Sequence, residues 1–195
     1  MGNRYLDTAL VDKAIIFATR AHANTERRSK GYPYVIHAME AMSIVATMTP
    51  DPELLAASVL HDTVEDTEVT IEDIRREFGD RVAKLVEMES DKNVEGVSEE
   101  ASWHSRKQAA IDRLAAASKD AKMVALGDKL SNMRAISRDW DVSGDELWKI
   151  FHTKDKSEHE WHYRGLAESL KELSGTFAYN EFISLIDHVF PKNNN

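Results

Sequence analysis

Residues 51–66 read DPELLAASVLHDTVED, and this stretch decides the fold class. Asp51 followed by Pro52 is typical of a helix N-cap with proline at the first helical position. The apolar residues behind them recur at helical spacing and carry the pattern as far as His61-Asp62. The stretch therefore predicts a buried helix whose far end presents side chains that can bind a metal ion or transfer a proton.

The segments that precede this helix follow the same pattern. Apolar positions at helical spacing predict one helix over about residues 7–25, with Asp7 as its N-cap, and a second over residues 34–48. Gly31 and Pro33 break the pattern between them. We expect two helices joined by a turn, with His37 near the start of the second.

The remaining sequence also predicts helices. Thr70-Ile71-Glu72-Asp73 resembles a capping box that opens a short helix ending at Gly79, and Ser118 and Ser143 are expected N-caps. Further helical patterns cover about residues 81–89, 99–116, 119–137, 147–151, 156–173 and 177–189. Strand signals are close to absent, because no extended run alternates β-branched or aromatic residues with polar ones. The sequence predicts an all-α fold in a single domain over residues 1–195.

Composition limits the class of protein. The chain of 195 residues is 42% hydrophobic and lacks any run near the roughly 20 apolar residues of a membrane span. Its start, MGNRYLDTALVDK, has no apolar signal core, and Leu6 stands where a myristoylation signal has serine or threonine. A net charge of -9 argues against a general nucleic-acid surface, and the absence of cysteine fits a reducing compartment. We expect a cytoplasmic protein with neither a membrane nor a nucleic-acid partner.

The segment His61-Asp62-Thr63-Val64-Glu65-Asp66 concentrates four side chains that can bind a metal or transfer a proton. If the helix continued through it, His61 would share a face with Glu65, and Asp62 with Asp66. An HD dipeptide alone arises often by chance. A histidine at a helix end, followed by exposed acids, would be the simpler interpretation.

Asp128 favours the metal site over this simpler interpretation, because it interrupts the apolar pattern of a helix predicted to be buried. The pattern comprises Met123, Val124, Leu126, Leu130, Met133 and Ile136. An unpaired buried carboxylate is very costly, so Asp128 requires a cation, which a metal, Lys129 or Arg134 could supply.

The joint occurrence of an isolated histidine, His37, with the His61-Asp62 pair and Asp128 favours one divalent ion bound by these four side chains. With no cysteine in the chain, any metal must use imidazole and carboxylate ligands. Such a mixed set permits Mn²⁺, Fe²⁺ or Zn²⁺.

These four residues stand in the order H…HD…D, which resembles the HD phosphohydrolase superfamily. The sequence is more closely similar to the hydrolase half of the Rel/SpoT proteins and to the stand-alone small alarmone hydrolases, over roughly residues 14–136. The resemblance is carried by RSKGYPYVIH (28–37), HDTVEDTEVTIEDI (61–74), Phe78-Gly79, SDK (90–92), Arg106-Lys107 and DKLSNMR (128–134).

The resemblance implies an HD-type helical bundle that hydrolyses ppGpp and pppGpp to GDP or GTP and pyrophosphate with Mn²⁺. It implies that His37, His61, Asp62 and Asp128 hold the metal. Glu65 and Asp66 would orient or deprotonate the attacking water. The candidates for substrate contacts are Arg27, Arg28, Lys30, Tyr34, Lys107, Lys129, Asn132 and Arg134. Whether Arg27 or Arg28 matches the family arginine stays open.

The chain has no room for a synthetase half, so a hydrolase-only member is expected, with further helices over about residues 143–190. Two departures stand out. Gly127 replaces the alanine of the familiar Ala-Asp-Lys-Leu, and the stretch SEHEWHY (157–163) lacks the aromatic residues that animal-type small hydrolases place before the tryptophan. The second departure leaves guanine specificity open.

Three other functions remain open at this level. The same chemistry would serve an HD phosphohydrolase acting on a 5′-nucleotide, a dNTP or the 2′-phosphate of NADPH. The domain could also be a catalytically silent nucleotide-binding module, although the intact ligand set argues against it, or a helical bundle with a structural metal. The expected partner is a small-molecule nucleotide, and the oligomeric state is undetermined.

Overall fold

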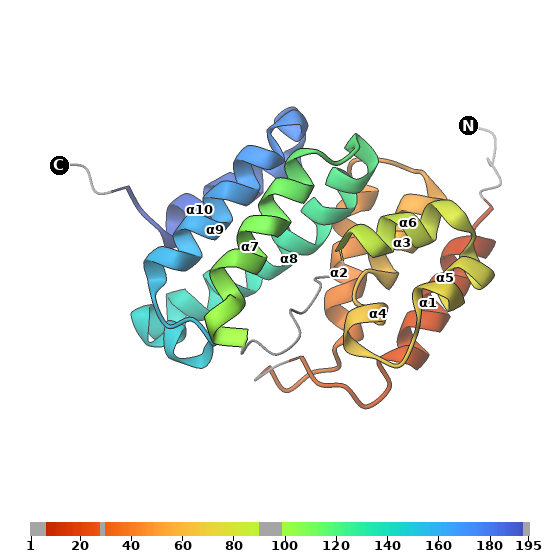
Figure 1. Ribbon diagram of the computed structural model, residues 1–195, viewed down its shortest axis with the longest axis horizontal. Helices are drawn as coiled ribbons and strands as arrows, with labels where there is room; N and C mark the ends of the chain where they lie inside the picture. The colour runs from red at the N-terminus through yellow and green to blue at the C-terminus, as the bar shows by residue number, and fades with distance from the viewer. Residues whose placement is uncertain (1–6, 28–29, 90–98, 193–195) are drawn as a thin grey trace, which may run out of the picture.

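The computed structural model describes residues 7–27, 30–89 and 99–192 (Figure 1). Within those ranges the chain is helical and forms no strand, apart from an isolated bridge between Glu26 and Pro33. The predicted all-α class is confirmed. No helix in these ranges is both long enough and apolar enough to cross a lipid bilayer.

The helices fall into two groups along the chain. The first group is α1 (Ala9–Ala21), α2 (Val35–Ala46), α3 (Pro52–Leu60), α4 (Thr63–Asp66), α5 (Ile71–Phe78) and α6 (Asp80–Glu89). The second is α7 (Glu99–Ala115), α8 (Lys119–Ser143), η1 (Gly144–Ile150), α9 (Lys156–Ser169), η2 (Lys171–Leu173) and α10 (Phe177–Val189), where η denotes a 3-10 helix.

Local capping accounts for three of the helix starts that the sequence predicted. The prediction of Asp7 as the N-cap of α1 is wrong by one residue, because Thr8 is the N-cap and Asp7 accepts from the Ala9 amide at 3.0 Å. The Asp51 carboxylate accepts a hydrogen bond from the Glu53 amide at 2.9 Å and opens α3. Thr70 and Asp73 form the reciprocal capping box of α5, and Ser118 accepts from an amide in the first turn of α8. Each cap satisfies amides that the first turn of a helix leaves without an internal partner.

Several helix bounds differ from the prediction. α1 ends at Ala21 instead of near residue 25, and the helix predicted over 147–151 is the 3-10 helix η1 over Gly144–Ile150. α8 continues to Ser143 instead of ending near residue 137, and the Ser143 side chain caps nothing. The helix ends where Gly144 adopts a positive φ of 54° and donates its amide to Trp140. Such a backbone favours glycine. The predicted helix over 156–173 is divided at Leu170 into α9 and η2.

α8 joins the two groups of helices. Figure 1 places α1 to α6 on the right and α7, α9 and α10 on the left, and α8 packs against α2 and α3 on one side and α10 and η1 on the other. Each group has its own cluster of buried apolar side chains, and both clusters contain residues of α8. Residues of α8 can therefore meet residues of the first group in the interior.

Gly127 lets α8 approach α2 closely. A Cβ atom at this position would lie 2.7 Å from the backbone oxygen of Ala41 and 2.7 Å from Cγ2 of Val45. Such contacts are too short for any real side chain, so the glycine is required by the spacing of the two helices. The approach sets Asp128 of α8 beside His37 of α2.

Candidate metal centre

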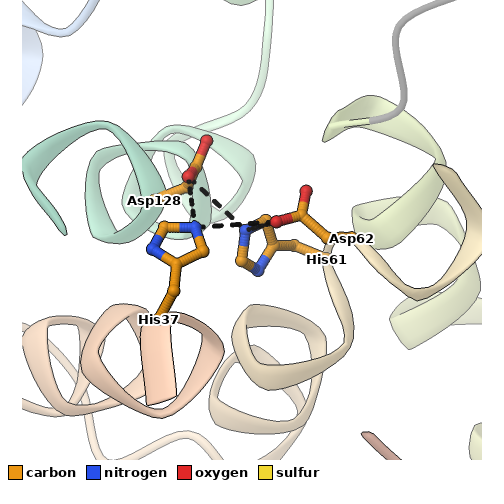
Figure 2. Close-up of side chains that lie close together, drawn as sticks. All are labelled: His37, His61, Asp62 and Asp128. Atoms are coloured by element: carbon orange, nitrogen blue, oxygen red, sulfur yellow. Dashed lines mark ion pairs between the residues drawn. The ribbon is translucent and has the colours of Figure 1, made fainter. Parts of the chain in front are cut away.

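The four predicted metal ligands meet in the interior. Figure 2 shows the imidazoles of His37 and His61 and the carboxylates of Asp62 and Asp128 turned toward one another. One ligand atom from each residue lies within 4.8 Å of all the others. Nε2 of His37 is 3.1 Å from Oδ1 of Asp128, and Nε2 of His61 is 2.7 Å from Oδ2 of Asp62.

A break in the helix brings His61 and Asp62 to the same point. The sequence predicts His61-Asp62 at the far end of a helix, and α3 does end at Leu60, while α4 begins only at Thr63. The Thr63 hydroxyl donates to the Leu60 carbonyl at 2.7 Å, which satisfies an acceptor at the end of α3. Consecutive side chains on an unbroken helix point about 100° apart. The intervening turn allows both residues to face one ion.

Hydrogen bonds at Nδ1 fix both imidazoles in the form that a metal requires. Nδ1 of His61 donates to the Ser58 carbonyl at 2.8 Å, since a carbonyl can only accept. Nδ1 of His37 lies 2.8 Å from Oγ of Ser131, whose hydroxyl donates to Glu40 at 2.7 Å, so His37 is again the donor. Both Nε2 atoms are then lone-pair acceptors, and both are buried without a hydrogen-bond partner. This arrangement fits a metal cation.

The electrostatics of the cluster favour positive charge at its centre. Burial opposes ionisation of Asp128, but Lys129 and the two imidazoles hold the pKa of its carboxyl well below the ordinary value. Burial likewise opposes protonation of His61, yet Asp62 and Asp128 raise its pKa well above the ordinary value. The carboxylates thus attract a proton to His61 in the absence of an ion, and a bound cation would displace it.

Three members of the cluster, His37, Asp62 and Asp128, line a cavity of about 190 Å³. A second cavity of about 460 Å³ adjoins it, and Arg27, Tyr34 and Asn132 line both. Of the other predicted residues, the first cavity is lined by Glu65, Lys107 and Lys129, and the second by Lys30 and Asp66.

The two predicted water-activating residues face different cavities. Glu65 lines the cavity that contains the metal cluster, whereas Asp66 lines the neighbouring one. Burial and the nearby Asp62 carboxylate raise the pKa of Asp66 above its ordinary value. Tyr34 lines both cavities, and its hydroxyl donates a hydrogen bond to the Asp62 carboxylate at 2.5 Å.

The predicted basic residues have separate surroundings. Nη2 of Arg27 donates to Oδ1 of Asn132, whose amide donates to Asp128 at 2.6 Å. Lys129 is paired with Asp128 at 2.5 Å and with Glu89 at 3.3 Å, so it neutralises buried carboxylates. Arg28 lies outside the described residues, as do residues 90–92 of the resemblance.

Arg134 is the one predicted contact among the described residues that lines neither cavity. Its guanidinium binds Glu181 at 2.6 and 2.7 Å and Glu40 at 3.2 Å. Through Glu40 it belongs to the hydrogen-bonded network behind His37 and does not face the space beside the metal cluster.

Sequence reasoning missed three buried polar residues near the site. Ser131 supports His37, and Glu89, whose side chain is 6% exposed, pairs with Lys129. His22 is buried with its ring centroid 4.8 Å from that of Tyr34. None of these residues interrupts an apolar pattern as sharply as Asp128 does, so no comparable signal marks them.

Comparison with known families and proteins identifies a matching family and several similar proteins. Residues 14–151 match the model of the HD domain family. The GTP pyrophosphokinase of Streptomyces coelicolor is 36% identical over 128 residues, which cover 65% of this chain and 14% of that protein. The guanosine-3′,5′-bis(diphosphate) 3′-pyrophosphohydrolase of Aquifex aeolicus is 43% identical over 77 residues, which cover 40% of this chain and 11% of that protein. The chain thus matches a small part of these relatives.

Two solved structures have a similar fold. A metazoan orthologue of SpoT, described as hydrolysing ppGpp, superimposes with a TM-score of 0.75 at 23% identity, covering 96% of this chain and 98% of that one. The protein lmo0812 of Listeria monocytogenes gives a TM-score of 0.70 at 26% identity, covering 80% of this chain and 99% of the other.

Proposed function

Because this chain belongs to the HD domain family, we propose that it hydrolyses ppGpp and pppGpp at the 3′ position, giving GDP or GTP and pyrophosphate. The observation that carries the proposal is the cluster of His37, His61, Asp62 and Asp128, three of which line a cavity that is also lined by basic side chains. The names of the relatives in Aquifex and among metazoans support the choice of nucleotide.

The cluster would hold one divalent ion, and Mn²⁺ suits its two imidazoles and two carboxylates. An ion bound there supplies a Lewis acid that polarises the water and offsets charge at phosphorus. Tyr34 and Asn132 hold the Asp62 and Asp128 carboxylates by hydrogen bonds, and so keep the ligands oriented.

The surrounding residues divide the remaining work of hydrolysis. Arg27 and Lys107 line the cavity and would bind oxygens of the 3′-pyrophosphate. Glu65 lines the same cavity and would take a proton from the attacking water. The bond between the ribose O3′ and phosphorus then breaks, and pyrophosphate leaves with the oxygen of that water while O3′ regains a proton.

Chromatography of the products from a panel of nucleotides incubated with Mn²⁺ tests this function. The expected result is GDP and pyrophosphate in equal amounts from ppGpp, without GMP or orthophosphate. Efficient turnover of a 5′-nucleotide, a dNTP or NADPH, with none of ppGpp, would assign the site to another HD phosphohydrolase activity.

A further inference from the structure

The second cavity continues the site along α8. Asp128, Asn132 and Asp139 are four and seven residues apart, so they lie on one face of this helix over about three turns. Asp128 belongs to the metal cluster, Asn132 lines both cavities, and Asp139 lines only the second. One molecule can therefore extend from the metal cluster to Asp139.

The second cavity has walls of mixed character, with apolar and aromatic side chains beside charged ones that include one ion pair. Its apolar and aromatic lining consists of Tyr34, Ala135, Ile136, Ile150, Phe151 and Tyr163. Nζ of Lys30 is paired with Oδ2 of Asp139, and these side chains are 19% and 33% exposed. Glu26 and Asp66 also line it, so carboxylates outnumber cations there. A second phosphate group would be repelled, whereas a flat, uncharged ring with a polar edge fits.

The Lys30–Asp139 pair offers hydrogen-bond acceptors beside a donor. A carboxylate accepts several hydrogen bonds, so its contact with Lys30 through Oδ2 leaves Asp139 with further capacity. Guanine presents two donors, N1–H and the N2 amino group, next to the acceptor O6. Adenine presents an acceptor, N1, where guanine has a donor, so its edge would set a lone pair against the carboxylate.

We propose that Lys30 and Asp139 together read the Watson–Crick edge of a guanine base, with Asp139 accepting from N1–H and the N2 amino group and Lys30 donating to O6. The inference rests on the proposed function, which places the phosphate end of the nucleotide at the metal cluster. A purely structural ion pair would instead tie the turn before α2 to α8 and would affect every nucleotide equally.

Calorimetric binding of GDP, IDP and ADP tests the inference without requiring turnover. IDP lacks only the N2 amino group, so the expected order of affinity is GDP, then IDP, then ADP. Asp139→Asn should weaken GDP binding about 10- to 100-fold, the range for a hydrogen bond to a charged group, and should weaken ADP binding little. Lys30→Met should weaken the binding of GDP and of IDP by the same factor, because both bases carry O6.

Asp141→Asn is the matched control, since Asp141 pairs with His188 at 2.7 Å and lines neither cavity. It should leave all three affinities unchanged, and thermal unfolding of each variant verifies the fold. A parent protein without preference among the bases, or an Asp139→Asn variant that loses affinity equally for all three, would overturn the inference. Base preference without cleavage of ppGpp would instead overturn the proposed function alone.

Discussion

Nδ1 of His37 lies 2.8 Å from Oγ of Ser131, and this contact connects a metal-cluster histidine to a network that reaches the far side of α8. The Ser131 hydroxyl donates a hydrogen bond to the Glu40 carboxylate, which also accepts one from the Arg134 guanidinium. Arg134 thus fixes the orientation of Glu40, and Glu40 that of Ser131. The family resemblance makes Arg134 a candidate for contact with the substrate. The structure places it behind the cluster, where it stabilises the carboxylate that orients Ser131.

Ser131→Ala should weaken metal binding without unfolding the protein. The substitution removes the acceptor for the Nδ1 proton of His37, so the imidazole can place a proton on Nε2. Loss of such supporting contacts typically lowers metal affinity about 10- to 100-fold. Competition titration with a chelator measures the change. Ser131→Thr keeps the hydroxyl and should restore most of the affinity, and equal affinities for Ala and Thr variants would exclude this role.

Glu65→Gln should keep its metal and lose turnover. Removing a general base typically costs about 10²- to 10⁴-fold in rate, while the four ligands are untouched. Asp66→Asn should lose less of the turnover rate than Glu65→Gln, because Asp66 lines the neighbouring cavity. Metal stoichiometry and single-turnover rates for both variants check this prediction. A metal-free Glu65→Gln protein would make Glu65 a ligand, and a near-parental rate would show that no carboxylate base is needed there.

Gly127→Ala should destabilise the protein although alanine is the better helix former. The helix propensity gain is about 1 kcal/mol, but overpacking against the Ala41 backbone costs about 1–3 kcal/mol. The free energy of unfolding in urea gives the net effect. Gly165→Ala is the matched control in α9, where the new Cβ meets only the Ile111 side chain, 2.6 Å from its terminal Cδ1. That side chain can move, so this variant should be neutral or more stable.

Asp51→Asn should lower stability in a pH-dependent manner. Hydrogen bonds from Arg81 hold the pKa of Asp51 below its ordinary 3.8. The stabilisation is therefore fully present above pH 3.8 and is lost as the pH falls through the lower pKa of the folded state. Asparagine still caps α3, so the loss near neutral pH should be only about 0.5–1 kcal/mol.

Urea unfolding of parent and Asp51→Asn at neutral pH and in increasingly acidic buffers measures this difference. The gap in unfolding free energy should narrow below pH 3.8 and should be smaller in an Arg81→Met background, where only the backbone amides of Glu53 and Leu54 still favour the Asp51 carboxylate. A gap that stays constant with pH would mean that the charge of Asp51 contributes nothing.

Local signals account for what the sequence predicts well. Asp51, Thr70 and Ser118 bond amides within three residues, so a short window contains both partners of each cap. Asp128 was recognisable because a carboxylate on an apolar helix face requires a cation. The fold class follows from the same short-range patterns.

Long-range contacts account for what the sequence does not reveal. Lys30 pairs with Asp139, 109 residues away, and Arg134 with Glu181, so no local pattern indicates which acid neutralises which base. The sequence places His61-Asp62 at the end of a helix but leaves open whether the helix continues to Asp66, because the turn between α3 and α4 follows from contacts of the folded state.

The central claim, one metal ion held by four named ligands, is tested most directly by the metal content of Asp128→Ala after dialysis. Circular dichroism would verify that this variant remains helical. The parent should retain about one divalent ion per chain, and Asp128→Ala should lose both the ion and the hydrolysis of ppGpp. An Asp128→Ala protein that keeps a full complement of metal would contradict the account.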